Sequence, residues 1–550
     1  MPLNRQSSFL FGILALAALP SLAQRPPTAG QLLQQVEPPP SLPSADVPPT
    51  VVEERAVAPA ADGTRFRLEG VRLSGNRVYT EEELLPMVQD DIGKTLSLDQ
   101  LDALARRITD YYRARGYLVA RAYLPPQEIK DGIVTIAVLE GRLGEIILNN
   151  SSGLAGNAIA PVHRIRPGDA VNNLEFEGAL LRLADIPGVE VKSTLRPGAS
   201  VGTSDFLVDV APGPALTGSF DADNFGNRYT AAARVGASVF WNNPTGLGDQ
   251  VSLRAQTGGS NFSYGRIGYQ LPVGSSATRV GVAWSRMDYK LGEDFSSLEA
   301  GGDATVGSIY LQHPLLRSRE RSWFATLQFD QKRLRDYIGV VESQTEKRVN
   351  LWSIGTSANF IDGLGGGGSN SASLTYSRGQ LGLDALSDLI DSFTARSQGA
   401  FGKWALSYQR LQRLPGQFLL SLSANGQRAN KNLDSSEKML LGGATGVRAY
   451  PQGEASGDNG YLVNLELRYP LGQSWDAIGF YDRGRVTVNH SPWLNASDNG
   501  RDLAGYGVGA SYSAARFALR VFAAWKAGTG APESDVDRTP RIWMQGSSQF

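Results

Sequence analysis

The C-terminal part of the chain, from Pro214 to Phe550, consists of short segments in which apolar and polar residues alternate. A period of two places successive side chains on opposite faces of a β-strand. In the segment "RFALRVFAAWK", one face would carry Phe517, Leu519, Val521, Ala523 and Trp525. The segments are separated by glycine-rich turns such as "IDGLGGGGSNS". This pattern predicts a long run of antiparallel strands with one apolar and one polar face.

The length of this region favours a barrel over a sandwich, because a single sandwich domain has only about 100 residues. At roughly twenty residues per strand and loop, residues 214–550 hold about sixteen strands, an even number typical of outer-membrane barrels. Charged residues such as Glu466 and Arg520 would then face a wet lumen. The chain also ends on an aromatic residue, as such barrels commonly do. We therefore predict a transmembrane antiparallel β-barrel, with Phe550 as its assembly signal.

The first 23 residues have the features of a secretory signal peptide. Arg5 supplies the positive charge, Phe9 to Leu19 form the apolar core, and small residues precede a mature start near Gln24. No later window approaches the roughly 18–20 apolar residues that a membrane helix needs. The net charge of −1 and the absence of cysteine argue against nucleic-acid binding and exclude disulfides and thiolate sites.

Residues 24–64 are rich in proline and contain one short helical pattern at about residues 29–37. Leu32, Leu33 and Val36 fall on one side of this predicted helix. Proline residues bracket it, and the remainder is predicted to be an extended linker.

Two α+β units are predicted between the linker and the barrel, at residues 65–143 and 144–213. In the first, Thr80 followed by Glu83 fits a helix N-terminus with a capping box, and a second helix is expected over about 98–113. Strands flank these helices. The second unit repeats the plan in shorter form, with a strand, a helix over about 174–183 and a closing strand pair. The similarity of the two plans indicates an internal repeat.

The order of these parts resembles the two-partner secretion transporters of the Omp85 superfamily, which export haemolysins and filamentous adhesins. The most specific evidence is "VRAY" at Val447–Tyr450, which is similar to the family signature V-R-G-[YF] with Ala449 in place of glycine. A second family motif, F-x-D-x-G, occurs as Phe480, Asp482 and Gly484. The resemblance implies that the α+β units are periplasmic POTRA domains and that the N-terminal helix plugs the barrel.

The resemblance also implies that a loop around residues 440–460 folds into the lumen. The guanidinium group of Arg448 could then pair with the carboxylate of Asp482, whose geometry it matches. Away from bulk water, breaking one side of such a pair costs about 3–5 kcal/mol. Ala449 in place of glycine limits the local backbone conformation, because alanine rarely adopts a positive φ. We call the set Val447, Arg448, Ala449, Tyr450, Phe480, Asp482 and Gly484 the latch.

The function implied by the resemblance is secretion of a large exoprotein of haemolysin or adhesin type. The POTRA domains would capture this unfolded partner, and the barrel pore would pass it to the cell surface. Other expected partners are outer-membrane lipid and the barrel assembly machinery that inserts the chain itself. No nucleotide motif occurs, so folding of the exported chain outside the cell is expected to give direction.

Three alternatives remain open from the residues alone. An Omp85-type assembly factor usually carries more POTRA units, and a passive porin would not need the periplasmic units. An outer-membrane hydrolase lacks support because no G-x-S-x-G elbow occurs. The histidines, His163, His313 and His490, lack metal-ligand spacing. The glycine-rich segments do not join a strand to a helix and no Lys-Ser/Thr follows them, so we expect neither a nucleotide nor a cofactor.

Overall fold

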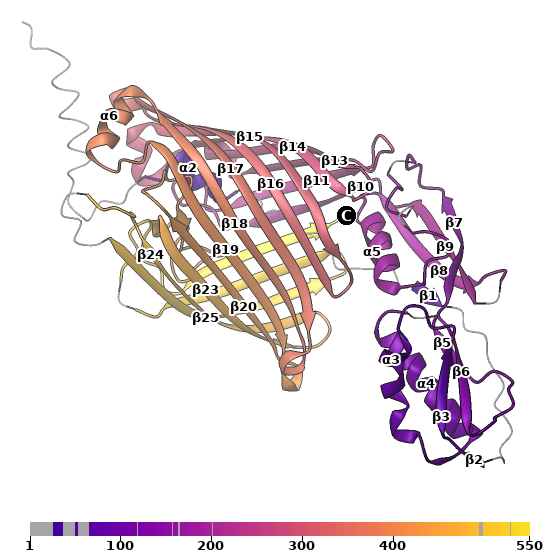
Figure 1. Cartoon of the computed structure of the whole chain (residues 1–550). Coiled ribbons are helices and arrows are strands. Elements are labelled where there is room, and N and C mark those ends of the chain that lie inside the picture. The colour runs from indigo at the N-terminus through magenta and orange to yellow at the C-terminus, as the bar shows by residue number, and fades with distance from the viewer. Residues whose placement is uncertain are drawn as a thin grey trace, which may run out of the picture.

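The computed structural model describes residues 26–36, 50–52, 65–117, 119–156, 158–162, 165–200, 202–493, 499–528 and 530–550. Two small α+β units lie beside one end of a long barrel (Figure 1). The predicted signal peptide lies outside the described residues, and so do residues 37–49 and 53–64 of the linker.

Sixteen antiparallel strands close the barrel, as the alternation and the length of the region predict. In chain order they are β10 (Leu216–Asp223), β11 (Arg234–Asn242), β12 (Gln250–Thr257), β13 (Phe262–Val273), β14 (Thr278–Lys290), β15 (Ala300–Arg317), β16 (Arg321–Ile338), β17 (Ser343–Asp362), β18 (Gly368–Leu383), β19 (Gly399–Arg413), β20 (Leu419–Ala429), β23 (Asn459–Pro470), β24 (Trp475–Thr487), β25 (Gly500–Ala514), β26 (Phe517–Lys526) and β27 (Arg541–Gln549). The last strand pairs with the first, β10. Phe550 extends this seam: its N–H donates to the carbonyl of Gly218 over 3.0 Å, and its ring lies 5.4 Å from that of Phe220.

Because apolar and polar residues alternate along the strands, apolar side chains of the barrel wall face the lipid and polar side chains face the lumen. Trp352 and Ile354 on β17 are 56% and 61% exposed although both are apolar. Aromatic pairs such as Phe329–Trp352, with ring centroids 4.8 Å apart, lie on this outer face. The inner face is polar; for example, Ser308 donates to the buried carboxylate of Asp330 over 2.6 Å. This division is what a bilayer outside and water inside require.

An α-helix interrupts the region that the sequence pattern predicts to be a run of strands. Helix α6 (Ala385–Phe393) lies between β18 and β19 at the end of the barrel away from the α+β units (Figure 1). The carboxylate of Asp384 accepts the N–H groups of Leu386 and Ser387 and so caps its first turn. None of the helices in the described ranges has the length and apolar character needed to cross a bilayer.

The first α+β unit follows the predicted plan, with one additional short strand between its two helices. Its elements are β2 (Arg65–Arg67), β3 (Gly70–Ser74), α3 (Glu81–Leu84), β4 (Thr95–Ser97), α4 (Leu98–Ala114), β5 (Arg121–Tyr123) and β6 (Ile133–Leu139). Strands β3, β6 and β5 form one sheet, and β2 pairs with β4. The capping box predicted at Thr80 and Glu83 begins α3, and Ser97 with Gln100 begins α4 in the same way.

The second unit contains β7 (Arg142–Asn150), α5 (Asn173–Ala184), β8 (Val189–Pro197) and β9 (Thr203–Pro212). A fourth strand of its sheet comes from the linker: β1 (Thr50–Val52) pairs in parallel with β8. The sequence predicts only an extended chain here. An extended segment that meets a free sheet edge can add a strand to it through backbone hydrogen bonds alone, which leaves little side-chain signal.

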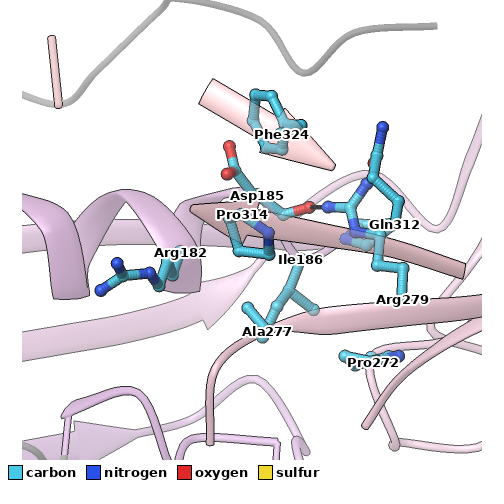
Figure 2. Close-up of a pocket in the computed structure, with 11 residues that line it drawn as sticks. Arg182, Asp185, Ile186, Pro272, Ala277, Arg279, Gln312, Pro314 and Phe324 are labelled. Carbon is cyan, nitrogen blue, oxygen red and sulfur yellow. Dashed lines mark hydrogen bonds between the residues drawn. The ribbon is translucent and has the colours of Figure 1, made fainter. Parts of the chain in front are cut away.

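The second unit is joined to the barrel by a buried ion pair. The guanidinium of Arg317, at the end of β15, donates to both carboxylate oxygens of Asp185 over 2.7 and 2.9 Å. The side chains are 2% and 14% exposed. Figure 2 shows Arg279 of β14, which donates to the backbone carbonyl of Asp185. A cavity of about 20 Å³ remains at this joint, room for about one water molecule.

Replacement of Arg317 by methionine should loosen this joint. The change leaves Asp185 without the guanidinium group that pairs with it. Breaking one side of a buried ion pair costs about 3–5 kcal/mol of free energy. Because the chain contains no cysteine, two spin labels at introduced cysteines, Ser200→Cys and Leu364→Cys, would report the distance between unit and barrel. We expect a broader distance distribution in Arg317→Met. The control Arg319→Met acts at the same joint but removes only a 44% exposed partner of Glu177, which keeps the backbone N–H of Arg319, and it should broaden the distribution much less.

Candidate functional site

The loop between β20 and β23 lies inside the barrel. A short hairpin, β21 (Met439–Leu440) with β22 (Ser456–Gly457), gives it internal structure. The apolar side chains of the loop pack on aromatic residues of the wall, and this buried cluster contains Leu441, Val447, Ala449, Tyr450, Leu462, Ile478, Phe480, Val486, Leu503, Phe522, Ala524 and Trp543. Such packing against β23–β27 fixes the loop along one side of the lumen.

The structure brings Arg448 and Asp482 into direct contact. The Nε and Nη2 atoms of Arg448 donate to the two oxygens of Asp482 over 2.8 and 2.6 Å, and the backbone N–H of Arg448 donates to the same carboxylate over 3.1 Å. Arg448 is 3% exposed and Asp482 is fully buried. Burial alone would lower the pKa of Arg448, but hydrogen bonds and charge from Asp482 outweigh it and raise the pKa. The arginine therefore remains charged.

Arg448 also binds a second carboxylate, which the motif did not predict. The Nη1 atom of Arg448 donates to Glu466 of β23 over 2.6 Å. Glu466 also accepts a hydrogen bond from Arg468 over 2.7 Å. The guanidinium carbon lies 3.6 Å from the ring centroid of Phe480, which adds a cation–π contact. The sequence did indicate that Glu466 faces the lumen, because it lies on the polar side of the alternating strand that follows the loop.

The remaining residues of the latch shape its fit. A Cβ atom at Gly484 would lie 2.8 Å from the side chain of Leu441, so glycine permits the loop to approach the wall. Ala449 does not adopt a positive φ, and a Cβ at Gly505 would lie 2.5 Å from that of Ala449. The alanine in the signature therefore fits without backbone strain. Val447 and Tyr450 are buried in the same cluster.

Lysines on the opposite side of the lumen hold the start of the loop. Lys332 of β16 and Lys403 of β19 contact the two carboxylate oxygens of Glu437 over 3.0 and 2.9 Å. Lys347 contacts Asp434 over 2.8 Å. Burial alone would raise the pKa of Asp434, but the nearby charge of Lys347 lowers it to about 2. This ion pair is therefore present at higher pH and is lost only as the pH falls through about 2.

The N-terminal helix α2 (Ala29–Gln34) also lies inside the lumen, against β15 and β16. Leu32, Leu33 and Val36, the predicted apolar side, are buried. Their seat is an apolar cluster of the wall strands and of the loops after β10 and β14, and it contains Tyr229, Phe262, Tyr264, Met287, Tyr289, Leu291, Ala300, Ala304, Val306 and Leu334. The apolar side of the helix therefore packs against the barrel, while Gln34 on its polar side contacts the loop.

The helix and the loop touch each other. Thr28 donates to the hydroxyl of Ser435 over 3.0 Å, and the side chain of Gln34 donates to the carbonyl of Ser435 over 3.0 Å. A Cβ atom at Gly30 would lie 2.6 Å from the backbone nitrogen of Ser436. The segment 434–437 thus has the helix on one side and the wall lysines on the other.

The site consists of a helix and a loop inside a closed barrel, and the comparisons assign the chain to one family. The model described as haemolysin secretion/activation protein ShlB/FhaC/HecB matches residues 202–512. The model for the ShlB-type POTRA domain matches residues 66–141. The chain therefore belongs to this family and is an outer-membrane transporter of the two-partner secretion class, with its POTRA domains in the periplasm. The family is one of transporters and not of enzymes.

Individual relatives agree with this assignment. The heme/hemopexin transporter protein HuxB of Haemophilus influenzae (strain 86-028NP) is 31% identical over 472 residues, 83% of each chain. The outer membrane transporter CdiB of Dickeya dadantii is 24% identical over 76% of this chain and 74% of its own. The predicted family and class of transporter are confirmed.

Solved structures share the fold. CdiB from Escherichia coli has a TM-score of 0.71 at 20% identity, with 100% of both chains covered. BamA from Haemophilus ducreyi lacking POTRA domains 1–3 has a TM-score of 0.54 at 13% identity, with 88% of this chain and 100% of that chain covered. At these identities the likeness concerns the fold alone. It confirms the predicted barrel with POTRA domains.

Proposed function

We propose that this chain exports one large, unfolded exoprotein of haemolysin or adhesin type from the periplasm to the cell surface. The observation that carries the proposal is a lumen that contains a short helix, α2, and an infolded loop, in a barrel whose periplasmic end carries POTRA units. A passive pore has no use for such parts. Among the relatives, HpmB of Proteus mirabilis is named a hemolysin transporter protein and HuxB a heme/hemopexin transporter protein.

The helix α2 would close the resting barrel and leave it during export. Several features support a reversible plug: the helix has only six residues, and its polar contacts to the loop are few. Its seat buries Leu32, Leu33 and Val36, and burial of three such side chains stabilises the plugged state without a covalent tie. The loop, held by the latch, would keep the lumen in a defined shape while the exoprotein passes.

The exoprotein would first bind to the first POTRA unit. A groove of about 640 Å³ lies between α4 and the segment that follows β5. Half-exposed apolar side chains line it, among them Leu98, Tyr123, Leu124 and Ile129. An extended, unfolded chain exposes apolar side chains that could fill this groove.

The edge of the sheet beside this groove is partly closed. The backbone N–H of Ala122 in β5 donates to the hydroxyl of Thr109 in α4 over 2.9 Å. The side-chain amide of Gln127 exchanges two hydrogen bonds of 2.7 Å with the backbone of Thr135 in β6. These side chains occupy backbone hydrogen-bonding groups at the edge of the sheet. We therefore favour capture of the exoprotein by side-chain contacts in the groove over its addition as a strand beside β5.

Replacement of both Leu98 and Leu124 by serine should weaken capture of the exoprotein. Each change removes most of the apolar surface that one leucine offers, about 1.5–3 kcal/mol when fully buried by the ligand. We expect the Kd for a labelled N-terminal fragment of the exoprotein, measured by anisotropy with the full chain in detergent, to rise at least about tenfold. Ile92→Ser, at a 40% exposed position of the same unit outside the groove, is the matched control. Equal loss in the control would contradict this role of the groove.

The alternative function is that of an Omp85-type assembly factor, and BamA shares the fold. Purified protein in liposomes distinguishes the functions. A transporter should move its own exoprotein across the membrane and leave unrelated barrels uninserted. An assembly factor should insert those barrels, and a porin should only conduct ions. Phe550 would guide insertion of the chain itself by the barrel assembly machinery, as its position at the seam with β10 supports.

A further inference from the structure

Two arginines lie directly opposite each other on the outer face of the barrel. The strand register pairs Arg333 of β16 with Arg348 of β17. Both are exposed. The adjacent residues Lys332 and Lys347 reach into the lumen, where they bind carboxylates of the loop. Since successive side chains of a strand point to opposite faces, the two arginines point outward.

The pair lacks a protein counter-ion. Directly opposed side chains have Cβ atoms about 4.5–5.5 Å apart, and like charges at that distance destabilise a sheet. Carboxylates of the same face have other partners: Asp303 binds Arg335, and Glu346 accepts a hydrogen bond from Gln344 over 2.7 Å. Within the described ranges, no ion pair or side-chain hydrogen bond involves the guanidinium of either arginine.

The pair lies above outward-facing aromatic rings, toward the end of the barrel away from the POTRA units. Strand β16 runs outward from the periplasmic joint, so its end near Arg333 faces the cell exterior. The aromatic pair Phe329–Trp352 lies four residues below, with Trp352 56% exposed. Four residues at about 3.3 Å, tilted by about 40°, place the arginines about 10 Å above those rings. Aromatic side chains on this face mark the boundary between acyl chains and headgroups.

We propose that Arg333 and Arg348 together bind the phosphate of a lipid headgroup in the outer leaflet. Two guanidinium forks that share one phosphate form charge-assisted hydrogen bonds and remove the repulsion between the arginines. The exposed Trp352 and Ile354 below the pair offer an apolar surface to the acyl chains of the same molecule. The matching ligand is a lipid with a phosphorylated headgroup. This site lies outside the transport path and does not depend on the proposed function.

The test compares lipid retention by the wild type and by Arg333→Gln/Arg348→Gln. Full-length proteins are delipidated, incubated with lipopolysaccharide that carries lipid A phosphates, and analysed by native mass spectrometry. We expect the double variant to retain at least about tenfold less of this lipid than the wild type. The control Arg483→Gln/Arg485→Gln removes two exposed outer arginines that have Asp502 beside them, and it should retain the wild-type amount. Heat-modifiable electrophoretic mobility shows that each variant is folded.

Three results would overturn the proposal. The first is equal retention by the wild type and the double variant. The second is equal binding of lipopolysaccharide from which the lipid A phosphates have been removed. The third is complete displacement of the lipid by millimolar inorganic phosphate, which would define a site for the free anion and not for a lipid.

Discussion

Replacement of Arg448 by alanine should leave a folded barrel that secretes its exoprotein at least about tenfold more slowly. The change removes three side-chain ion contacts, to Asp482 and Glu466, and leaves the buried Asp482 without its cation, while Glu466 keeps Arg468. Removing one partner of a buried ion pair costs about 3–5 kcal/mol of free energy. A change of this size can shift a loop that is almost always bound to the wall to one that is mostly unbound. Secretion into the medium, relative to barrel in the membrane, measures the effect.

Two further variants distinguish the latch from general damage to the wall. Arg448→Lys keeps a charge but not the fork, so partial secretion is expected. Arg468→Ala removes an arginine of β23 that binds the same Glu466, and it should secrete normally. The double variant Arg448→Ala/Asp482→Ala should be no worse than either single change, because both remove one interaction. Normal secretion by Arg448→Ala would contradict the latch.

Replacement of Gly30 by valine should open the resting barrel to ions. A side chain at position 30 meets the backbone of Ser436, which cannot move away while Glu437 is held by two lysines. The helix α2 would therefore be pushed from its seat. The expected result in planar bilayers is a several-fold higher conductance, close to that of a variant lacking residues 24–40.

The matched control for the helix is Gln31→Ala. Gln31 belongs to the capping box of α2, so the change removes about 1 kcal/mol of helix stability without a clash. If Gly30→Val and the deletion both conduct like the wild type, α2 is not the plug. If Gln31→Ala alone opens the barrel fully, helix stability and not the fit to Ser436 controls closure.

The sequence predicts most of the fold because alternation is local. Each strand of the wall shows its own apolar face, and the capping box at Thr80 and Glu83 marks the start of the first helix of the first POTRA unit. The latch contact was predictable for a related reason: Arg448 and Asp482 lie in two motifs of one family, separated by a single strand. The helix α6 was missed because its apolar residues at helical spacing lie within a region of strands.

The parts that sequence reasoning missed depend on contacts between distant residues. Thr28 and Ser435 are 407 positions apart, and neither residue has a local pattern that indicates its partner. The apolar seat of α2 comes from side chains on several strands, each of which reads as an ordinary inward position. The lysines at positions 332, 347 and 403 likewise acquire a role only when barrel closure places them opposite the loop.

The central claim is that an exoprotein crosses the membrane through the lumen of this barrel. The most direct measurement places the purified chain in liposomes that contain no other protein and supplies the unfolded exoprotein on the POTRA side. Without any nucleotide, we predict that the exoprotein becomes inaccessible to protease added on that side, and that Arg448→Ala largely abolishes this transfer. An exoprotein that stays fully digestible while the wild-type barrel is folded and inserted would contradict the account.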